Sequence, residues 1–286
     1  MPTVYDTAQS FRAALLAEDR TATLRLIAAY GDAWARLTLD LAAVTRLIAE
    51  KRSAGETPSA SWLHRQARYQ ALLAQVAEEV NRITATMEPL ITGQQASFVR
   101  QAQEHARELV RLSQTGAPSS IDVTFTTLNP DALTSLVGFL SDGSPLATLL
   151  NELGPDAAQR VSQALTRGMI LGHGIPEIAR ETRKAFGGTM ARALTIARTE
   201  TLRAYRESSL LTYQANADVL RGWVWLSARD KRTDAFCWAM HGTVHPLSAR
   251  MATHPRCRCT PVPFVKGEPS PVGRTGAELF PALPAA

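Results

Sequence analysis

The residues best suited to chemistry lie near the carboxyl end of the chain, in the order Cys237-x3-His241-x3-His245-x8-His254-x2-Cys257-x-Cys259. Zinc binds four nitrogen or sulfur ligands in a tetrahedron, usually from two short chelating pairs that a loop separates. Cys237 with His241 forms one such pair, and His254 with Cys257 or Cys259 forms the other. The candidate metal ligands are therefore Cys237, His241, His254, Cys257 and Cys259, and the candidate cofactor is Zn²⁺.

The same spacing is compatible with other roles. It lacks the doubled Cys-x2-Cys pattern that is typical of a zinc ribbon. Free cysteine is among the most buried residue types, so the three cysteines also suit a metal-free structural core. A disulfide is a further alternative, although a reducing compartment disfavours it.

A metal-dependent nuclease is the enzymatic alternative, because a histidine can activate water while an ion polarises a phosphate. Such sites usually add carboxylates, and only Asp230 and Asp234 lie near in sequence. Arg198 and Glu200 stand two residues apart on an expected helix, about 200° around its axis, so they do not form one acid–base pair. The sequence shows no Gly-rich phosphate loop, no nucleophile elbow and no HExxH motif. We therefore expect a protein that is not an enzyme.

A chain of 286 residues must position this cluster, and that length suits one large domain or two ordinary ones. Its longest apolar runs are only a few residues, far short of the ~20 that cross a bilayer. The N-terminus has neither the basic start nor the apolar block of a signal peptide. We expect no membrane partner and a cytoplasm-like compartment.

Residues 1–115 are predicted to form an elongated helical arm, because apolar residues recur there at helical spacing. One stripe consists of Ile27, Tyr30, Trp34, Leu37, Leu41, Val44 and Ile48, and the other of Tyr69, Leu73, Val76, Val80, Ile83, Met87 and Leu90. The Gly- and Pro-containing stretch 53–59 indicates an antiparallel hairpin in which the stripes face each other or a partner. Pro89 and Gly93 allow a further break or kink.

Residues 116–155 are predicted to be a joint, with a short strand at 121–125 and short helices, and residues 156–264 a compact module. In that module Gly172-His173-Gly174 ends one helix, and Gly187-Gly188 is a turn before a long helix that Thr189 caps. Residues 223–226 read as a strand covered on both faces, and residues 262–264 as an edge strand. The Pro-rich tail 265–286 is expected to be extended or disordered until docked. The predicted fold class is mainly α with a small β element (α+β).

Basic residues are concentrated in the same region. Between residues 187 and 264 the chain has eleven Lys and Arg against five acidic residues, while its formal net charge is only +5. Such an excess permits contact with phosphate or with an acidic protein face. The alternative is a solvated helix face with a few structural arginines. The candidate nucleic-acid-binding residues are Arg198, Arg203, Arg206, Arg256 and Arg258.

Five short motifs follow one another between about Asp156 and Phe264. They are Ile196-Ala197-Arg198-Thr199-Glu200, Gly222-Trp223-Val224-Trp225, Asp230-Lys231-Arg232-Thr233, Cys237 with Gly242, and His254-Pro255-Arg256-Cys257-Arg258-Cys259. In this order they resemble the phage head-morphogenesis family, the Mu F-like minor head proteins. Family members often carry a cysteine directly after the Arg-Thr pair, where this chain has Asp234. His241 or His245 would have to replace it in any metal site.

The resemblance implies a minor capsid protein that takes part in head morphogenesis of a tailed bacteriophage. Such proteins associate with the portal protein during procapsid assembly and lie inside the virion head near packaged DNA. The expected partners are the portal protein, a scaffold or major capsid protein, and DNA bound without sequence specificity. The host cytoplasm is the expected location during assembly. Head proteins of this kind can be fused to effector domains, so a toxin-like effector module joins the nuclease as an alternative; no further domain follows Phe264, which counts against it.

Overall fold

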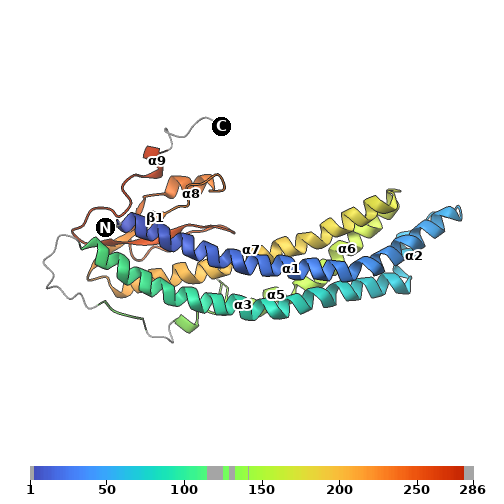
Figure 1. Ribbon diagram of the computed structural model, residues 1–286, viewed down its shortest axis with the longest axis horizontal. Helices are drawn as coiled ribbons and strands as arrows, with labels where there is room; N and C mark the ends of the chain where they lie inside the picture. The colour runs from blue at the N-terminus through green and yellow to red at the C-terminus, as the bar shows by residue number, and fades with distance from the viewer. Residues whose placement is uncertain (1–2, 115–124, 129–132, 141, 280–286) are drawn as a thin grey trace. The chain divides into compact units, whose positions relative to one another are not determined.

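The structure, a computed structural model, describes residues 3–114, 125–128, 133–140 and 142–279. Most of them are helical, and a three-stranded antiparallel sheet lies near the carboxyl end (Figure 1). The predicted fold class, mainly α with a small β element, is confirmed. The predicted strand at 121–125 falls almost wholly outside the described residues. In the described part of the chain, no helix combines the length and apolarity that a membrane span needs.

The helices and strands have the following bounds. The helices are α1 (Val4–Ser53), α2 (Ala60–His64), α3 (Ala67–Ser113), α5 (Leu146–Asn151), α6 (Leu153–Ile170), α7 (Ile175–Ala215), α8 (Ala235–Met240) and α9 (Gly276–Leu279). The strands are β1 (Leu220–Leu226), β2 (Val244–His245) and β3 (Thr260–Val265).

The chain divides into two compact units, each assembled from separate segments. The sheet unit consists of residues 1–20, 91–143 and 198–286, and the helical unit of residues 21–90 and 144–197. Each of α1, α3 and α7 contributes residues to both units. The units therefore do not follow the predicted division at residues 116 and 156, because both ends of the expected arm belong to the sheet unit.

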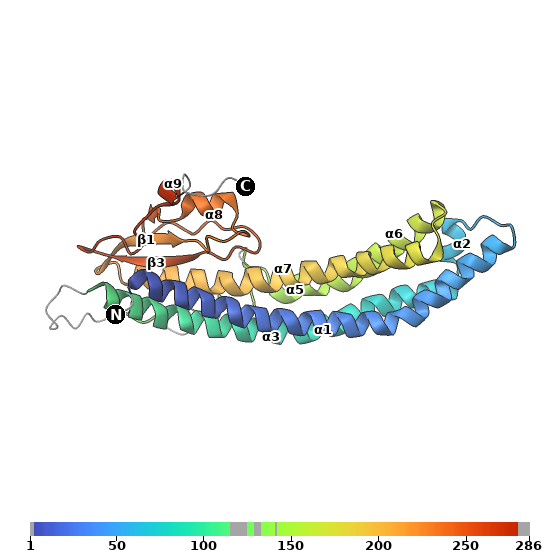
Figure 2. The same cartoon turned by 45° about the horizontal axis from the view of Figure 1, so that its top comes forward.

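The apolar stripes of α1 and α3 form the interior of the helical unit. Buried positions include Tyr30, Leu37, Leu41, Val44 and Ile48 on α1, and Tyr69, Val76, Val80, Ile83 and Met87 on α3. The two helices lie side by side in both views (Figures 1 and 2), and Arg36 Nη2 donates to Glu79 Oε2 at 2.7 Å across them. Ile27 is 42% exposed, and Trp34, Leu73 and Leu90 are partly buried. The predicted hairpin is thus present, and its stripes line the interior of the helical unit, where Tyr30 and Trp34 also contact Phe186 of α7.

Two expected interruptions are absent. Helix α3 continues through Pro89 and Gly93, and α7 continues through Gly187 and Gly188, so Thr189 is a buried residue within α7 rather than a cap. A helical glycine costs about 1 kcal/mol relative to alanine, and an interior proline about 3 kcal/mol. Burial of neighbouring apolar side chains offsets these costs, as Met87 and Ile91 do around Pro89, and Phe186 and Ala193 around the glycine pair.

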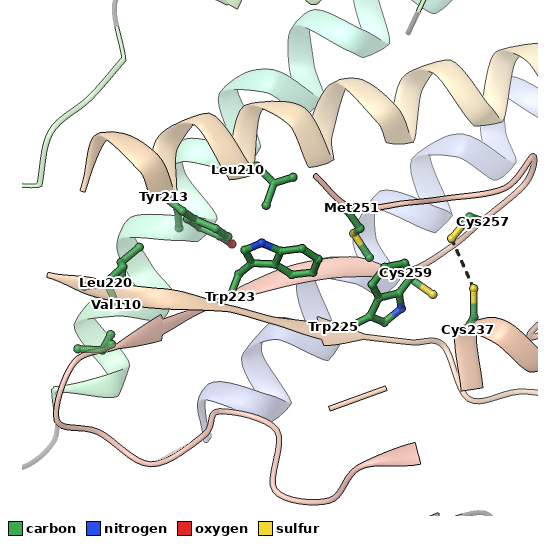
Figure 3. Packing of buried hydrophobic residues seen from close by; sticks show 12 residues of the cluster. Val110, Leu210, Tyr213, Leu220, Trp223, Trp225, Cys237, Met251, Cys257 and Cys259 are labelled. Carbon is green, nitrogen blue, oxygen red and sulfur yellow. Dashed lines mark hydrogen bonds between the residues drawn. The ribbon is translucent and has the colours of Figure 1, made fainter. Parts of the chain in front are cut away.

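The sheet unit is organised around β1, the central strand in the order β2-β1-β3. Both faces of β1 are buried, as its continuous apolar run predicts. Trp223 and Trp225 pack against Leu210 and Tyr213 of α7 on one face (Figure 3). Val224 and Leu226 pack on the other face in a cluster that contains Ala8 of α1 and Leu109 of α3.

Strand β3 pairs with β1 alone and contains Pro261 and Pro263, so the predicted edge strand is confirmed. In Figure 2, β1 and β3 lie beside the segments of α1, α3 and α7 that belong to the same unit. The tail is docked at least as far as α9: Val272 is buried, and the Gly276 N–H donates to the His241 carbonyl at 2.7 Å.

Candidate metal centre

A tight turn brings His254 and Cys257 together. The Cys257 N–H donates to the His254 carbonyl at 3.1 Å, with Pro255 and Arg256 between them. Arg256 has φ 63°, and a proline followed by a residue with positive φ is the arrangement of a type II turn. The Arg256 N–H also donates to Thr199 Oγ1 at 3.2 Å, which ties the turn to α7. The His-Pro-Arg-Cys sequence therefore determines the local geometry of the two side chains.

Helix α8 supplies the third side chain of the centre. The Asp234 carboxylate accepts a hydrogen bond from the Phe236 N–H at 2.9 Å and caps α8, which places Cys237 in the first turn. Cys237 Sγ lies 3.1 Å from His254 Nε2. It lies 3.7 Å from Cys257 Sγ, the contact that the dashed line in Figure 3 marks. The possible ligand atoms of Cys237, His254 and Cys257 all lie within 4.8 Å of one another.

Cys259 completes the set of sulfur atoms. It is fully buried, and it lines the same small cavity as Cys237 and His254. Hydrogen bonds from the Cys237 and Cys259 thiols lower the pKa of Cys257, and the charge of Arg206 acts in the same direction. The cluster therefore favours a thiolate at Cys257.

Arg206 of α7 lies buried directly behind the cysteines. Its Nη1 donates to the carbonyl oxygens of Cys257 and Cys259, at 3.3 Å each. Among the described residues, its buried Nη2 has no hydrogen-bond partner. Burial lowers the pKa of Arg206, whereas the neighbouring cysteines raise it. The arginine thus forms part of the support of the cluster and does not face solvent.

The structure separates His241 and His245 from this centre. His241 Nδ1 accepts a hydrogen bond from the Ser227 N–H at 3.2 Å, and burial lowers the pKa of His241 to about 4. His245 stacks on Trp223 with ring centroids 4.2 Å apart. The predicted pair of Cys237 with His241 is therefore wrong, because His241 serves the backbone after β1. Sequence spacing does not reveal that His241 follows a helix of only six residues and points elsewhere.

Most of the arginines predicted to contact nucleic acid are used inside the fold. Arg198 Nε donates to Asp19 at 2.6 Å, and Arg203 Nε donates to Glu200 at 2.8 Å. Both nitrogen atoms at the end of Arg258 face the Asp230 carboxylate, with Nη2 at 2.6 Å from Oδ1. Arg206 is buried, and Arg198, Arg203 and Arg258 are partly buried in ion pairs. Phosphate contact by these four arginines stays a prediction. Arg256 is the predicted arginine that is exposed.

One charged residue near the cluster gave no sequence signal. Arg12 of α1 is largely removed from solvent, and its pKa is lowered by burial and raised by the charge of Cys259. It stands more than two hundred residues before the cysteines in the chain. No local spacing rule links residues at such a separation.

The cavity at the cysteines has a volume of about 10 Å³, close to the room that one water molecule needs. Its lining includes Arg232, Asp234 and Arg256 as well as the Cys and His side chains. In the described part of the chain, the cluster with metal-ligand geometry contains no carboxylate. This cavity has room for a single ion. His254 also lines a second cavity of about 300 Å³, together with Thr199, Arg203 and Arg250 among others.

Residues 159–262 match the family described as Phage Mu protein F like protein. The matched segment contains most of α6, all of α7, β1 and α8, and the complete cysteine cluster. The match covers about a third of the chain and is similarity over these residues. The resemblance to the Mu F-like head-morphogenesis family that the five motifs indicate is therefore confirmed. No curated protein and no solved structure matches the chain.

Proposed function

We propose that this chain is a minor head protein that associates with the portal during procapsid assembly and lies inside the virion near packaged DNA. The family match over residues 159–262 is the observation that carries the proposal. Head morphogenesis requires contact with other head components, and the first partner we propose is the portal protein. A scaffold or major capsid protein is the second partner.

In this proposal the protein is not an enzyme. Two features support that choice: the cavity at the cysteines is of single-atom size, and Asp230 and Asp234 are engaged in holding Arg258 and capping α8. A nuclease needs an accessible phosphate position beside the ion. Incubation of the purified protein with plasmid DNA and divalent metals, with His254→Ala as the control, tests the alternative. Metal-dependent cleavage that disappears in His254→Ala would replace our proposal with the nuclease.

The surface for portal contact needs a new location, because most residues of the apolar stripes of α1 and α3 are buried inside the helical unit. The helical unit retains an apolar groove of about 240 Å³ between α1 and α7, lined by Ile27, Tyr30, Trp34, Phe186 and Met190, among others. Apolar grooves of this kind accept one face of a partner helix. The groove is therefore where substitutions should act on portal binding.

Copurification of the full chain with the portal protein tests the proposal. Ile27→Glu places a charge in the groove and should weaken copurification. Leu39→Glu is the matched control, because Leu39 lies on the same helix, is 80% exposed and does not line the groove. Absence of portal copurification from the unsubstituted chain would refute the association itself, whereas equal behaviour of the two variants would refute only the groove.

Direct contact with DNA is the remaining part of the proposal. Arg232 and Arg256 line the cysteine cavity and are exposed, as is Lys231 next to Arg232 in the chain. Such side chains neutralise phosphate without reading bases. Each lost phosphate contact should reduce the slope of log K against log salt by ~0.9. We expect this reduction for Arg256→Gln and no change for Arg111→Gln, whose guanidinium pairs with Glu108 on α3. An affinity that does not change with salt would show that phosphate contacts do not carry the binding, and no measurable affinity would refute direct contact with DNA.

A further inference from the structure

We propose that Cys237, His254, Cys257 and Cys259 bind one zinc ion, which ties α8 and the His254–Cys257 turn to the start of β3. Nothing in the family match assigns an ion to this chain. The proposal does not depend on portal or DNA binding. It rests on the geometry of Cys237, His254 and Cys257, on the nearby Cys259, and on the buried arginine behind them.

The separations of the ligand atoms fit a tetrahedral ion. With Zn–S bonds of about 2.3 Å, two sulfur ligands of a tetrahedron are separated by ~3.7 Å, and a sulfur and a nitrogen by ~3.5 Å. Cys237 Sγ and Cys257 Sγ are 3.7 Å apart, and Cys237 Sγ and His254 Nε2 are 3.1 Å apart. The first distance already equals a tetrahedral edge. A small rotation of the His254 ring brings the second to its edge length.

The His254 ring is oriented as a metal ligand. Its Nδ1 lies 2.9 Å from the Pro255 carbonyl oxygen, which can only accept, so Nδ1 carries the proton and donates. Nε2 is then the unprotonated nitrogen, and it is the atom that faces Cys237. Metal-binding histidines typically donate their other ring N–H to a backbone carbonyl or carboxylate in this way, which fixes tautomer and direction.

We assign Cys259 as the fourth ligand. It is separated from Cys257 by one residue and directly precedes β3. The ligand atoms that lie within 4.8 Å of one another are those of Cys237, His254 and Cys257, so closing the tetrahedron requires a shift of Cys259 Sγ toward them. Cys259 also lines the cavity that Cys237 and His254 line. His241, the other candidate, is excluded because its Nδ1 already accepts the Ser227 N–H.

The buried arginine behind the cluster suits a centre with negative charge. Three thiolates and a neutral imidazole leave one net negative charge on a zinc centre. Arg206 is a buried cation whose hydrogen bonds go to the carbonyls of Cys257 and Cys259, with Nη2 unpartnered among the described residues. The carboxylates of Glu207 and Glu200 also act on its charge. A zinc–thiolate centre would add negative charge directly beside this guanidinium, which three neutral thiols do not.

The test uses the full chain, expressed with zinc in the medium and purified without chelator. Elemental analysis should find about one zinc ion per chain. Replacement by Co²⁺ should give the visible bands of tetrahedral cobalt and a near-ultraviolet thiolate-to-cobalt band. A chelator should make the three thiols reactive toward a thiol reagent. These measurements need no variant, so they stand even if a cysteine substitution prevents folding.

His254→Asn should lose most of the zinc. The matched control is His64→Asn, because His64 is an exposed histidine on α2 and should leave the zinc content unchanged. Less than about a tenth of an ion per chain, with no thiolate-to-cobalt band on adding Co²⁺, would overturn the proposal. So would a zinc content that His254→Asn leaves intact, or a chain mass two hydrogens short because Cys237 and Cys257 form a disulfide.

Discussion

Arg256 holds a backbone conformation that few residues with a side chain adopt, with φ 63°. The left-handed region costs such a residue roughly 1 kcal/mol, and more if it is β-branched. The left-handed conformation of Arg256 is stabilised because it lets both the Cys257 N–H and the Arg256 N–H donate hydrogen bonds. The strain is thus held in place by the hydrogen bonds that orient His254 and Cys257.

Substitutions at Arg256 should separate backbone strain from side-chain chemistry. Arg256→Gly should change the free energy of unfolding by less than about 1 kcal/mol, because relief of strain is offset by the greater freedom of the unfolded chain. Arg256→Val should destabilise by about 1–3 kcal/mol. Urea unfolding of both variants measures the difference. If Val were tolerated as well as Gly, the positive φ would not be a constraint in solution.

His105 should make the stability of the protein pH-dependent. Burial lowers the pKa of His105 to about 4; the ring stacks on Phe11 with centroids 3.7 Å apart, and Nδ1 lies 3.0 Å from the Tyr205 hydroxyl. Between pH 6.5 and 4 the unfolded chain therefore binds more protons than the folded one at this position. The stability from neutral His105 is complete above pH 6.5 and is lost as the pH falls toward 4.

Unfolding temperatures measured between pH 7 and 4 test whether stability falls as the pH is lowered. His105→Phe should flatten the pH dependence, and His64→Phe should not, since His64 is exposed. His241, whose pKa is also lowered to about 4, should leave part of the slope in place. A slope identical in the His105→Phe variant would show that this histidine is not the source.

At the residue scale, the sequence predicts a site where ligand spacing is local and fails where partners are distant. Cys237, His254 and Cys257 lie together as their spacing suggests. The partner of an arginine is harder to predict, because Asp19, which pairs with Arg198, and the Cys257 carbonyl, which accepts from Arg206, are remote in sequence. A guanidinium that is buried and paired looks the same in the sequence as one that is free to bind phosphate.

At the element scale, helix α7 shows why glycine pairs are weak evidence for a turn. Gly187 and Gly188 have ordinary helical φ values and lie within a helix that continues to Ala215. An added Cβ at Gly187 would meet nothing within 4 Å, and one at Gly188 would lie 3.8 Å from Arg160 Nη1. Neither glycine is required by space or conformation.

Replacing Gly187 and Gly188 by alanine should therefore stabilise the protein, by about 0.5–1 kcal/mol each. The control is Gly276→Ala, where an added Cβ would lie 1.8 Å from the Trp238 carbonyl oxygen and must displace backbone. That substitution should destabilise by more than 1 kcal/mol. Thermal unfolding of the three single variants gives the comparison. Destabilisation by Gly187→Ala would mean that α7 bends at the glycine pair in solution.

Elements with long periodic patterns are predictable, and short ones are not. The stripes of α1 and α3 and the apolar run of β1 define those elements in the sequence. Strand β2 contains only Val244 and His245, too few residues to show a period. Pro89 leads to a wrong prediction for a different reason. The local rule that proline interrupts a helix predicts a break there, but burial of neighbours such as Met87 and Ile91 stabilises the continuous helix α3.

At the scale of the whole molecule, the sequence misplaces the boundaries between units. Gly- and Pro-rich stretches mark where helices end along the chain, but a unit is defined by which side chains share a core. The core on one face of β1 includes Ala8 and Leu109, with Val4, Tyr5 and Phe11 packed against it. Residues that precede the predicted boundary at 116 therefore complete the unit that contains the cysteine cluster.

A chain that begins at Gly116 should consequently fail to fold its sheet unit. It lacks the α1 and α3 side chains that cover Val224 and Leu226, and it lacks Arg12 beside Cys259. Loss of portal copurification on such a deletion would then reflect unfolding and not a missing docking surface. Point variants of the full chain avoid this ambiguity. Circular dichroism and urea unfolding of the shortened chain check the expectation, and a cooperative transition would contradict it.

A single substitution measures the same dependence without shortening the chain. Phe11→Ala removes the ring that stacks on His105 and packs against the β1 core, so it should destabilise by about 2–4 kcal/mol. Leu24→Ala is the matched control on the same helix: Leu24 is 57% exposed, and its removal should cost less than about 0.5 kcal/mol. Because Phe11 is more than two hundred residues from the cysteines, the thiol reactivity of Phe11→Ala is the decisive readout. If the first turns of α1 complete the sheet unit, the cysteines should become reactive at lower urea concentration in Phe11→Ala than in Leu24→Ala; equal reactivity would show that the cluster is stable without them.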